Sequence, residues 1–416
     1  MMDELNKTME LELASVPNVS IINVIEHLLI HACTVNASDI HIDPLEKSIR
    51  VRFRVDGVLE NSCTLPKNIH QEIISRIKIL SKLRTDEHQA TQDGRFRYLL
   101  PNKDTPSENS VYLRVSIAPT YHGENAVIRL LSDKMENFSL ENLGFSGDDI
   151  RKIMTALKKP SGMILATGPT GSGKTTTLYT LIKILNSPKV SIITIEDPIE
   201  YSLDDIEQIQ VNNHSGLTFV NGLRSILRQD PNIVMVGEIR DAETANIAVN
   251  TALTGHLLLS TLHTNDAATT LPRLLDMGIE EYLVASTVSI AIGQRLVRKI
   301  CSDCKEKKLM TQSLKESLRD TPFGKLIHNT EEKEFYFYNG NGCDRCGHSG
   351  YKGRICINEV LVADEVIREA ILRKASSSEI RNLAISRGMT TMFEDGFKKV
   401  EAGITTIEEI LRVIHE

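Results

Sequence analysis

The stretch ATGPTGSGKTTTLY, residues 166–179, joins the end of an apolar segment to a glycine-bearing loop and the start of a helical pattern. Residues 168–175 satisfy G-x-x-x-x-G-K-[ST], the pattern of a loop that holds nucleotide phosphates. Glycines let backbone N–H groups turn inward around the phosphates, and the N-terminus of the following helix adds positive charge. In such a loop Lys174 neutralises the β- and γ-phosphates, and the Thr175 hydroxyl is a ligand for Mg²⁺.

The setting of this loop distinguishes a phosphate-binding loop from a glycine-rich turn that matches the pattern by chance. The loop lies between a predicted strand and a predicted helix, which is the context that phosphate binding requires. We therefore expect ATP and Mg²⁺ as cofactors, with the nucleotide held by Gly168, Pro169, Thr170, Gly171, Ser172, Gly173, Lys174, Thr175 and Thr176.

Short apolar segments alternate with helical patterns around and after the loop. They are MILAT from 163, SIITIE from 191, NIVMVGE from 232 and LLLSTLH from 257. Nearly continuous apolar strands separated by helices are typical of a parallel sheet that is covered on both faces. The pattern predicts an α/β domain.

Residues 20–131 have a different pattern, which predicts a smaller α+β domain. Apolar residues at helical spacing follow a possible Ser20 cap, and residues 48–55 alternate between apolar and arginine side chains as a half-buried strand does. Asp56 and Gly57 then form a turn signal, and further strands are expected around 94–99, 111–116 and 126–131.

Composition limits the classes of function. The chain has 416 residues, a formal charge of −7, 5% aromatic residues and no Trp, which argues against direct binding of nucleic acid. The N-terminus lacks the order of a signal peptide, and the apolar stretch 282–293 is shorter than the roughly 20 residues of a membrane-spanning helix. We expect a cytoplasmic protein that reaches a membrane through partners.

A carboxylate follows the third apolar segment and can activate water. Glu238 would lie at the carboxyl edge of the parallel sheet, where such folds place their chemistry. Gly237 occupies the position where the second Walker strand usually carries its acidic residue, so we assign Glu238 to water activation rather than to direct Mg²⁺ binding. The alternative is a solvated glutamate at a strand end.

Two other predicted strand ends carry polar residues that would face the same edge. The segment ITIEDPIEY offers Glu196, Asp197 and Glu200, and STLHTNDA offers His263. A carboxylate there can hold Mg²⁺ through water, and a histidine can hydrogen-bond the γ-phosphate. Each residue taken alone is more often a locally satisfied polar group.

Four of the seven cysteines form two Cys-x-x-Cys pairs, Cys301 with Cys304 and Cys343 with Cys346. Two such pairs suit tetrahedral Zn²⁺, and four thiolates leave no open position for catalysis. We expect a structural zinc site, with reduced, metal-free thiols as the alternative.

The predicted segments are a flexible tail (1–19), the small α+β domain (20–131), a linker (132–144), the ATPase core (145–296), a tetracysteine module (297–355) and a helical C-terminal domain (356–416).

Long stretches of the chain carry a family likeness: ASDIHIDP from 37, VRFRVDGVL from 51, QDGRF from 92, the phosphate loop, ITIEDPIEY from 193, GLRSILRQDPNIVMVGEIRD from 222 and ALTGHLLLSTLHTNDA from 252. Together they resemble the secretion and pilus-assembly ATPases, which include the type II secretion and type IV pilus extension motors. The resemblance implies a RecA-like P-loop ATPase core and a homo-hexameric ring whose two domains move against each other.

The resemblance also implies roles for individual residues. Glu238 would be the catalytic glutamate beside Lys174, Glu196 would belong to an acidic box, and His263 to a histidine box. Four arginines would approach nucleotide phosphates: Arg114 and Arg129 in the small domain, and Arg224 and Arg228 in the ATPase domain. Without the resemblance, surface salt bridges are the favoured interpretation of these arginines.

The implied function is an ATP-driven motor for assembly of a type IV pilus or pseudopilus at the inner membrane. Such a motor acts on pilins indirectly, through a polytopic platform protein. Many relatives carry a further N-terminal docking domain, whereas residues 1–19 alone precede the first predicted helix here. A type II secretion motor is the first alternative, because it shares every motif named here. A retraction motor is disfavoured by the cysteine pairs and by the C-terminal stretch from residue 388. A nucleic-acid translocase is the alternative from another class of function.

Overall fold

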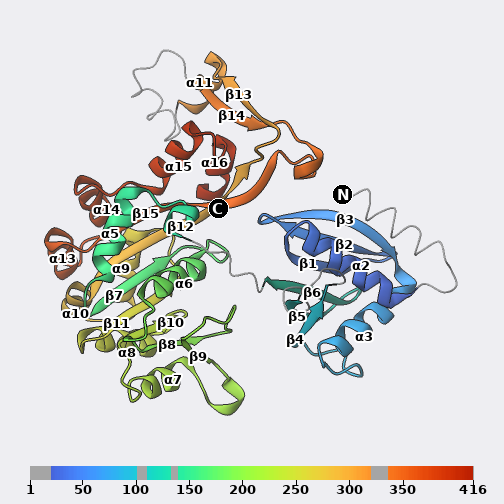
Figure 1. Ribbon diagram of the computed structural model, residues 1–416, viewed down its shortest axis with the longest axis horizontal. Helices are drawn as coiled ribbons and strands as arrows, with labels where there is room; N and C mark the ends of the chain where they lie inside the picture. The colour runs from blue at the N-terminus through green and yellow to red at the C-terminus, as the bar shows by residue number, and fades with distance from the viewer. Residues whose placement is uncertain (1–19, 101–109, 133–138, 320–335, 416) are drawn as a thin grey trace. The chain divides into compact units, whose positions relative to one another are not determined.

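A computed structural model describes residues 20–100, 110–132, 139–319 and 336–415. The tail predicted at 1–19 and residues 133–138 of the predicted linker lie outside these ranges. The chain forms two compact units, residues 1–136 and 137–416, which we call unit 1 and unit 2 and describe separately (Figure 1).

Unit 1 is an antiparallel sheet with two helices. Its elements are α2 (Ile21–Thr34), β1 (Ala37–Pro44), β2 (Ser48–Val55), β3 (Val58–Pro66), the 3₁₀ turn η1 (Lys67–Ile69), α3 (His70–Leu80), β4 (Gln92–Leu99), β5 (Ser110–Thr120) and β6 (Gly123–Ser132). The strand order is β3-β2-β1-β6-β5-β4. Alternate residues of these strands pack with α2 and α3 in one core, so the opposite residues point away from it.

Local signals in unit 1 form as the sequence predicts. The Ser20 side chain caps α2 by accepting a hydrogen bond from the N–H of Asn23. Asp56 and Gly57 both adopt positive φ, 47° and 88°, in the two-residue turn between β2 and β3. These angles match the twist of a tight hairpin, and Gly57 reaches them without a Cβ penalty.

Unit 2 contains a seven-stranded sheet with the order β15-β12-β7-β11-β10-β8-β9. The strands are β7 (Gly162–Thr167), β8 (Ile192–Glu196), β9 (Glu207–Gln210), β10 (Ile233–Val236), β11 (Leu257–Leu262), β12 (Val288–Ile300) and β15 (Tyr351–Val362). Six strands run parallel, and β15 pairs antiparallel with β12. The prediction of a mainly parallel α/β domain after a smaller α+β domain is confirmed.

Helices lie on both faces of this sheet: α4 (Leu140–Leu143), α5 (Gly147–Leu157), α6 (Lys174–Leu185), α7 (Phe219–Ile226), α8 (Ala242–Leu253), α9 (Ala267–Asp276) and α10 (Glu281–Thr287). The 3₁₀ turn η2 (Asn213–Ser215) precedes α7. In β7, Met163 and Leu165 face the core formed with α7–α10, whereas the buried Ile164 and Ala166 alternate to the other face. Burial on both faces explains the unbroken apolar pattern of β7.

The remaining elements of unit 2 follow β12. They are β13 (Lys305–Leu309), α11 (Gln312–Leu318), β14 (Tyr336–Gly340), η3 (Asp344–Cys346), α13 (Glu365–Leu372), α14 (Ser377–Ser386), α15 (Met392–Glu401) and α16 (Ile407–His415). The segment boundaries predicted at 296/297 and 355/356 fall inside β12 and β15 respectively. The cysteine module is therefore inserted between two paired strands of the main sheet.

One helix cap in this region differs from the simplest sequence pattern, and another follows it. Thr405 and Glu408 match the S/T-x-x-E pattern of a capping box, but Thr406 caps α16, because its hydroxyl accepts from the N–H of Glu409. The Thr405 hydroxyl instead donates to the carbonyl of Arg298 on β12. A complete capping box is found at Thr391, which the sequence analysis missed.

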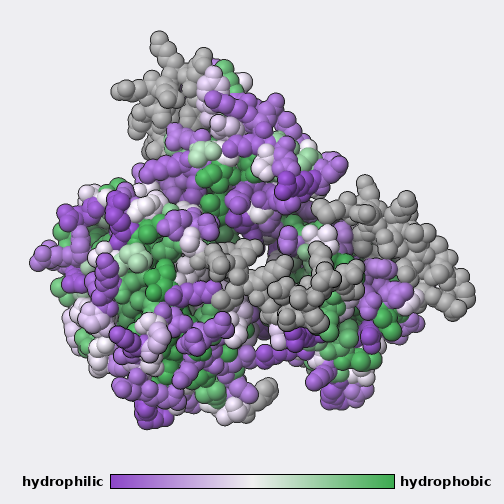
Figure 2. All heavy atoms as spheres, viewed as in Figure 1, coloured by the Kyte–Doolittle hydropathy of each residue, from purple (hydrophilic) through white to green (hydrophobic). Residues whose placement is uncertain are grey.

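Within the described ranges, no helix is both long and apolar enough to cross a membrane. On the face shown in Figure 2, hydrophilic and hydrophobic residues are intermixed.

Candidate active site

The phosphate-binding pattern lies between β7 and α6, as predicted, and α6 begins at Lys174. Gly168 and Gly173 adopt φ angles of 143° and 91°, which disfavour a residue with a Cβ. A Cβ at Gly168 would also lie 2.4 Å from the carbonyl oxygen of Gln294 on β12. Glycine at this position therefore lets the loop turn directly above the neighbouring strand.

The Lys174 side chain folds back onto its own loop. Its Nζ donates to the carbonyl oxygens of Gly168, at 2.8 Å, and Pro169, at 2.9 Å. Burial lowers the pKa of Lys174 to about 8, although the negative charge of Glu238 opposes the shift. A phosphate group would provide the anionic partner that this buried ammonium lacks.

Other loop residues also suit a phosphate ligand. Ser172 is buried, and its Oγ has no hydrogen-bond partner within the described part of the chain. Thr175 and Thr176 are half-buried in the first turn of α6, where helix N–H groups are free of intrahelical partners. The loop therefore offers an orphaned hydroxyl, a helix N-terminus and an ammonium group in one place.

Glu238 follows β10 and lies in contact with two basic side chains. Its Oε1 is 2.6 Å from a guanidinium nitrogen of Arg240, and its Oε2 is 3.2 Å from Nε2 of His263. His263 follows the neighbouring parallel strand β11, so the structure brings together these two predicted residues. Sequence reasoning missed Arg240, whose position two residues after Glu238 was the available signal.

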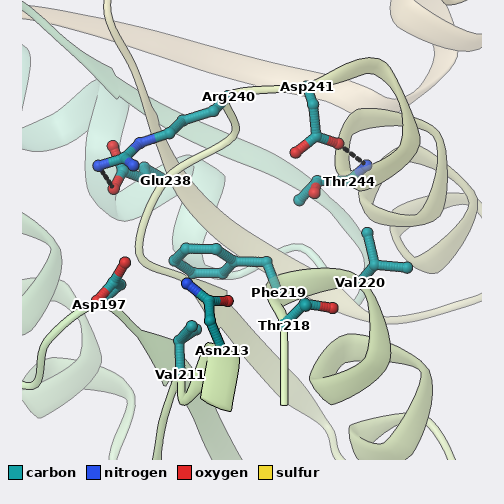
Figure 3. A pocket seen from close by; sticks show the side chains of 10 residues that line it. All are labelled: Asp197, Val211, Asn213, Thr218, Phe219, Val220, Glu238, Arg240, Asp241 and Thr244. Atoms are coloured by element: carbon teal, nitrogen blue, oxygen red, sulfur yellow. Dashed lines mark hydrogen bonds and ion pairs between the residues drawn. The ribbon is translucent and has the colours of Figure 1, made fainter. Parts of the chain in front are cut away.

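A cavity of about 220 Å³ opens beside Glu238. Figure 3 shows the Arg240 guanidinium turned toward Glu238, and the Asp241 carboxylate at the N-terminus of α8, where it accepts from the N–H of Thr244. Residues from the segments after β8, β9 and β10 and from the starts of α7 and α8 form its walls: Asp197, Val211, Asn213, Thr218, Phe219, Val220, Glu238, Arg240, Asp241 and Thr244.

The predicted acidic group after β8 has two environments. The exposed Asp197 lines the cavity beside Glu238, whereas Glu196 is only 2% exposed. The Glu196 carboxylate accepts hydrogen bonds from Tyr179 on α6, from Thr194 at 2.6 Å and from Gln208 at 3.1 Å. We expected Glu196 in the open cleft, but these hydrogen bonds draw it into the protein.

The buried glutamate affects two neighbouring phenols. Burial, together with the charge of Glu196, raises the pKa of Tyr179 and raises the pKa of Tyr201 to about 12. The two tyrosine rings pack edge to face with centroids 4.6 Å apart. Glu196 therefore ties the end of β8 to the helix that starts at the phosphate loop.

The arginines assigned by resemblance make surface contacts in each unit. Arg224 on α7 pairs with Glu243 at 3.0 Å, and Arg228, two residues after the end of α7, donates to the Arg224 carbonyl at 3.0 Å. In unit 1, Arg114 and Arg129 are cross-strand neighbours on β5 and β6. Their approach to nucleotide phosphates stays a prediction.

The four paired cysteines meet in one cluster, with all Sγ atoms within 4.8 Å of one another. Three of the Sγ–Sγ distances are 3.7, 3.8 and 3.9 Å. Zinc–sulfur bonds of about 2.3 Å in a tetrahedron place the sulfur atoms about 3.8 Å apart. Backbone N–H groups of Cys343 and Gly350 also donate to Cys346 Sγ, so the donor set fits a zinc ion.

Solved structures of two ATPases share this fold. The ATPase DotB of Legionella pneumophila aligns with a TM-score of 0.67 over 94% of this chain and 95% of its own, at 24% identity. The pilus retraction motor PilT with bound ADP aligns with a TM-score of 0.61 over 94% of this chain and 96% of its own, at 24% identity. Similarity at this level concerns the fold alone.

Curated relatives are closer in sequence. Type II secretion system protein E of Xanthomonas campestris is 46% identical over 95% of this chain and 68% of its own length. Type IV pilus assembly ATPase PilB of Thermus thermophilus is 45% identical over 90% of this chain, which spans 41% of that relative. The family model for type II/IV secretion system proteins matches residues 15–412, and the chain belongs to this family.

Proposed function

We propose that this chain hydrolyses ATP and, as a homo-hexameric motor, uses the energy to assemble a type IV pilus or pseudopilus. One observation carries the proposal: in a member of the type II/IV secretion family, Glu238 is held by Arg240 and His263 at the carboxyl edge of the sheet whose strand β7 leads into the phosphate loop. A carboxylate beside a phosphate-binding loop is the arrangement that phosphoryl transfer to water needs.

Each residue has a distinct part in this proposal. Lys174 neutralises phosphate charge, and the Thr175 hydroxyl would hold Mg²⁺, which would offset further negative charge on the phosphates. Glu238 orients the attacking water and takes up its proton, while His263 and Arg240 hold the two carboxylate oxygens in place. Glu196 acts indirectly, through its hydrogen bond from Tyr179 on α6.

The arginines make hydrolysis depend on assembly. In the proposed ring, movement of the units or of neighbouring copies brings four arginines to the transferring phosphate: Arg114, Arg129, Arg224 and Arg228. A fixed guanidinium stabilises the negative charge of that phosphate, so hydrolysis is fast only when the arginines are in place. A zinc ion held by the cysteine module would be structural, since four thiolates would fill its tetrahedral site.

The motor would work in the cytoplasm, peripherally associated with the inner membrane. A polytopic platform protein would transmit the movement to pilins, and no contact with nucleic acid is needed. A type II secretion motor is the alternative, because the Xanthomonas and Thermus relatives differ by one percentage point in identity to this chain.

Host cells carrying Glu238→Gln distinguish these functions. Surface fibres and secreted proteins are both counted, with the cellular level of the chain checked and with Glu207→Gln, at an exposed position of β9, as the control. Loss of fibres with normal secretion supports pilus assembly. Loss of secretion with normal fibres supports the alternative, and normal counts of both contradict the proposal.

A further inference from the structure

A row of charged residues crosses five strands of unit 1 on the face opposite its core. The strand register places Arg54 opposite Asp39, Asp39 opposite Arg129, Arg129 opposite Arg114, and Arg114 opposite Arg95. We call these five residues the arginine row; they lie on β2, β1, β6, β5 and β4 respectively. The row therefore contains four arginines and one carboxylate.

The single carboxylate, Asp39, forms ion pairs with Arg54 and Arg129 at one end of the row. Asp39 is buried, its Oδ1 accepts from Arg129 Nε at 2.9 Å, and its Oδ2 lies 3.5 Å from Arg54 Nε. Arg114 and Arg95 have exposed side chains and make no ion pair within the ranges that the structure describes. Among those described residues, no carboxylate forms an ion pair with the β5–β4 end of the row.

This arrangement is unfavourable unless an anion joins it. Residues directly opposite on antiparallel strands have Cβ atoms about 4.5–5.5 Å apart, and like charges at that spacing destabilise a sheet. Arg129, Arg114 and Arg95 form two such pairs in succession. A chain of phosphates would remove the repulsion, because a guanidinium fork matches phosphate oxygens in geometry and charge.

We propose that the arginine row is a binding site for a chain of phosphate groups, with Arg95 as a phosphate-binding residue beside Arg114 and Arg129. The inference rests on the proposed function, which already gives Arg114 and Arg129 a role at nucleotide phosphates. It adds Arg95 as a third binding residue and Asp39 as the residue that positions Arg129. The ligand is either the triphosphate of ATP or an inorganic polyphosphate.

The same strand supplies a matched control. Arg97 lies two residues after Arg95, is exposed on the same face of β4, and carries the same charge. It faces Tyr112 on β5 rather than an arginine, with its guanidinium 5.6 Å from the ring centre. Substitution of Arg97 changes the net charge of the face equally but leaves the row intact.

Titration calorimetry on the full chain tests the site with inorganic tripolyphosphate. A Lys174→Ala background removes the phosphate-loop ammonium, so that binding at the row is measured. We expect Arg95→Ala to weaken tripolyphosphate binding at least about tenfold, the loss of one charge-assisted contact, and Arg97→Ala to weaken it less than about twofold. Equal effects of the two substitutions, or none, would overturn the inference.

Two further readouts separate the other outcomes. Without ligand, Arg95→Ala should unfold no earlier than the parent, because it relieves repulsion; a lower unfolding midpoint would mean that Arg95 is structural and overturn the site. The same titration with ATP in place of tripolyphosphate identifies the natural ligand. If Arg95→Ala weakens ATP binding as much as tripolyphosphate binding, the ligand is the triphosphate of ATP. If Arg95→Ala leaves ATP binding unchanged, the ligand is an inorganic polyphosphate. Phosphate release by the unmodified chain tests the proposed function separately.

Discussion

A guanidinium nitrogen of Arg240 lies 2.6 Å from Oε1 of Glu238, the carboxylate that follows β10. The other carboxylate oxygen faces His263 at 3.2 Å, so both oxygens of Glu238 have a basic neighbour. A carboxylate held at both oxygens has a fixed direction, which is what a group that orients water requires. Arg240 is therefore expected to act by positioning Glu238.

We predict that Arg240→Ala lowers kcat for ATP hydrolysis about 10- to 100-fold, the equivalent of losing one charge-assisted hydrogen bond, with KM changed less than about twofold. Steady-state phosphate release measures both constants. Arg387→Ala is the control, because Arg387 forms a comparable exposed ion pair with Asp364 at 2.8 Å. A faster reaction in Arg240→Ala would show that Arg240 restrains Glu238 instead.

The buried ammonium of Lys174 predicts how nucleotide affinity depends on pH. Burial lowers its pKa from 10.5 to about 8, so the nucleotide-free chain loses this positive charge above pH 8. Phosphates favour the charged form, and binding must then take up a proton. The dissociation constant for ATP should rise above pH 8, by up to about tenfold per pH unit.

Fluorescent-nucleotide titrations between pH 7 and 9.5 check this dependence. The control is Lys174→Arg, in which the guanidinium stays charged throughout the range. The rise should be lost in Lys174→Arg, even if that variant binds more weakly at every pH. Parallel pH profiles for the two proteins would contradict the assignment to Lys174.

The buried carboxylate of Glu359 predicts an effect on the stability of unit 2. This buried residue of β15 accepts from the N–H of Ala267 at 2.8 Å and from the N–H of Met392 at 3.3 Å, the first residues of α9 and α15. Glu359→Ala leaves both N–H groups buried without this acceptor. We expect a loss of about 2 to 4 kcal/mol in the free energy of unfolding.

Denaturant titration measures this loss, with Glu369→Ala at an exposed position of α13 as the control. A surface substitution of this kind changes stability by less than about 0.5 kcal/mol. Equal unfolding curves for the two variants would mean that water replaces the Glu359 carboxylate at both helix ends.

The cysteine cluster predicts a bound metal. We expect about one zinc ion for each purified chain, and Cys343→Ser should remove most of it, because a tetrahedral site then lacks one thiolate. Elemental analysis by mass spectrometry gives the content directly. Cys63→Ser, which changes a half-buried thiol of β3 in unit 1, should retain the zinc, and a metal-free parent protein would contradict the prediction.

Local patterns were sufficient to predict the elements around the nucleotide site. The phosphate loop depends on eight consecutive residues, and Glu238 and His263 each follow an apolar strand that could be recognised from its own sequence. Because carboxyl ends of neighbouring parallel strands meet at one sheet edge, their proximity followed from the fold class.

Contacts between distant segments could not be predicted in this way. The burial of Glu196 depends on Tyr179 in α6 and Gln208 in β9, neither of which the local pattern relates to it. The pairing of β12 with β15 across the cysteine module is likewise non-local. Thr405 and Thr406 both fit a helix cap, and the hydrogen bond from Thr405 to Arg298 decided between them.

Phosphate release by purified Glu238→Gln is the decisive measurement, because the proposed function gives Glu238 the activation of the attacking water. We predict a rate at least about 100-fold below the parent, the contribution of a general base, with nucleotide binding retained. Retained binding would show that the substitution affects the chemical step. A Glu238→Gln protein that hydrolyses ATP as fast as the parent would contradict the account.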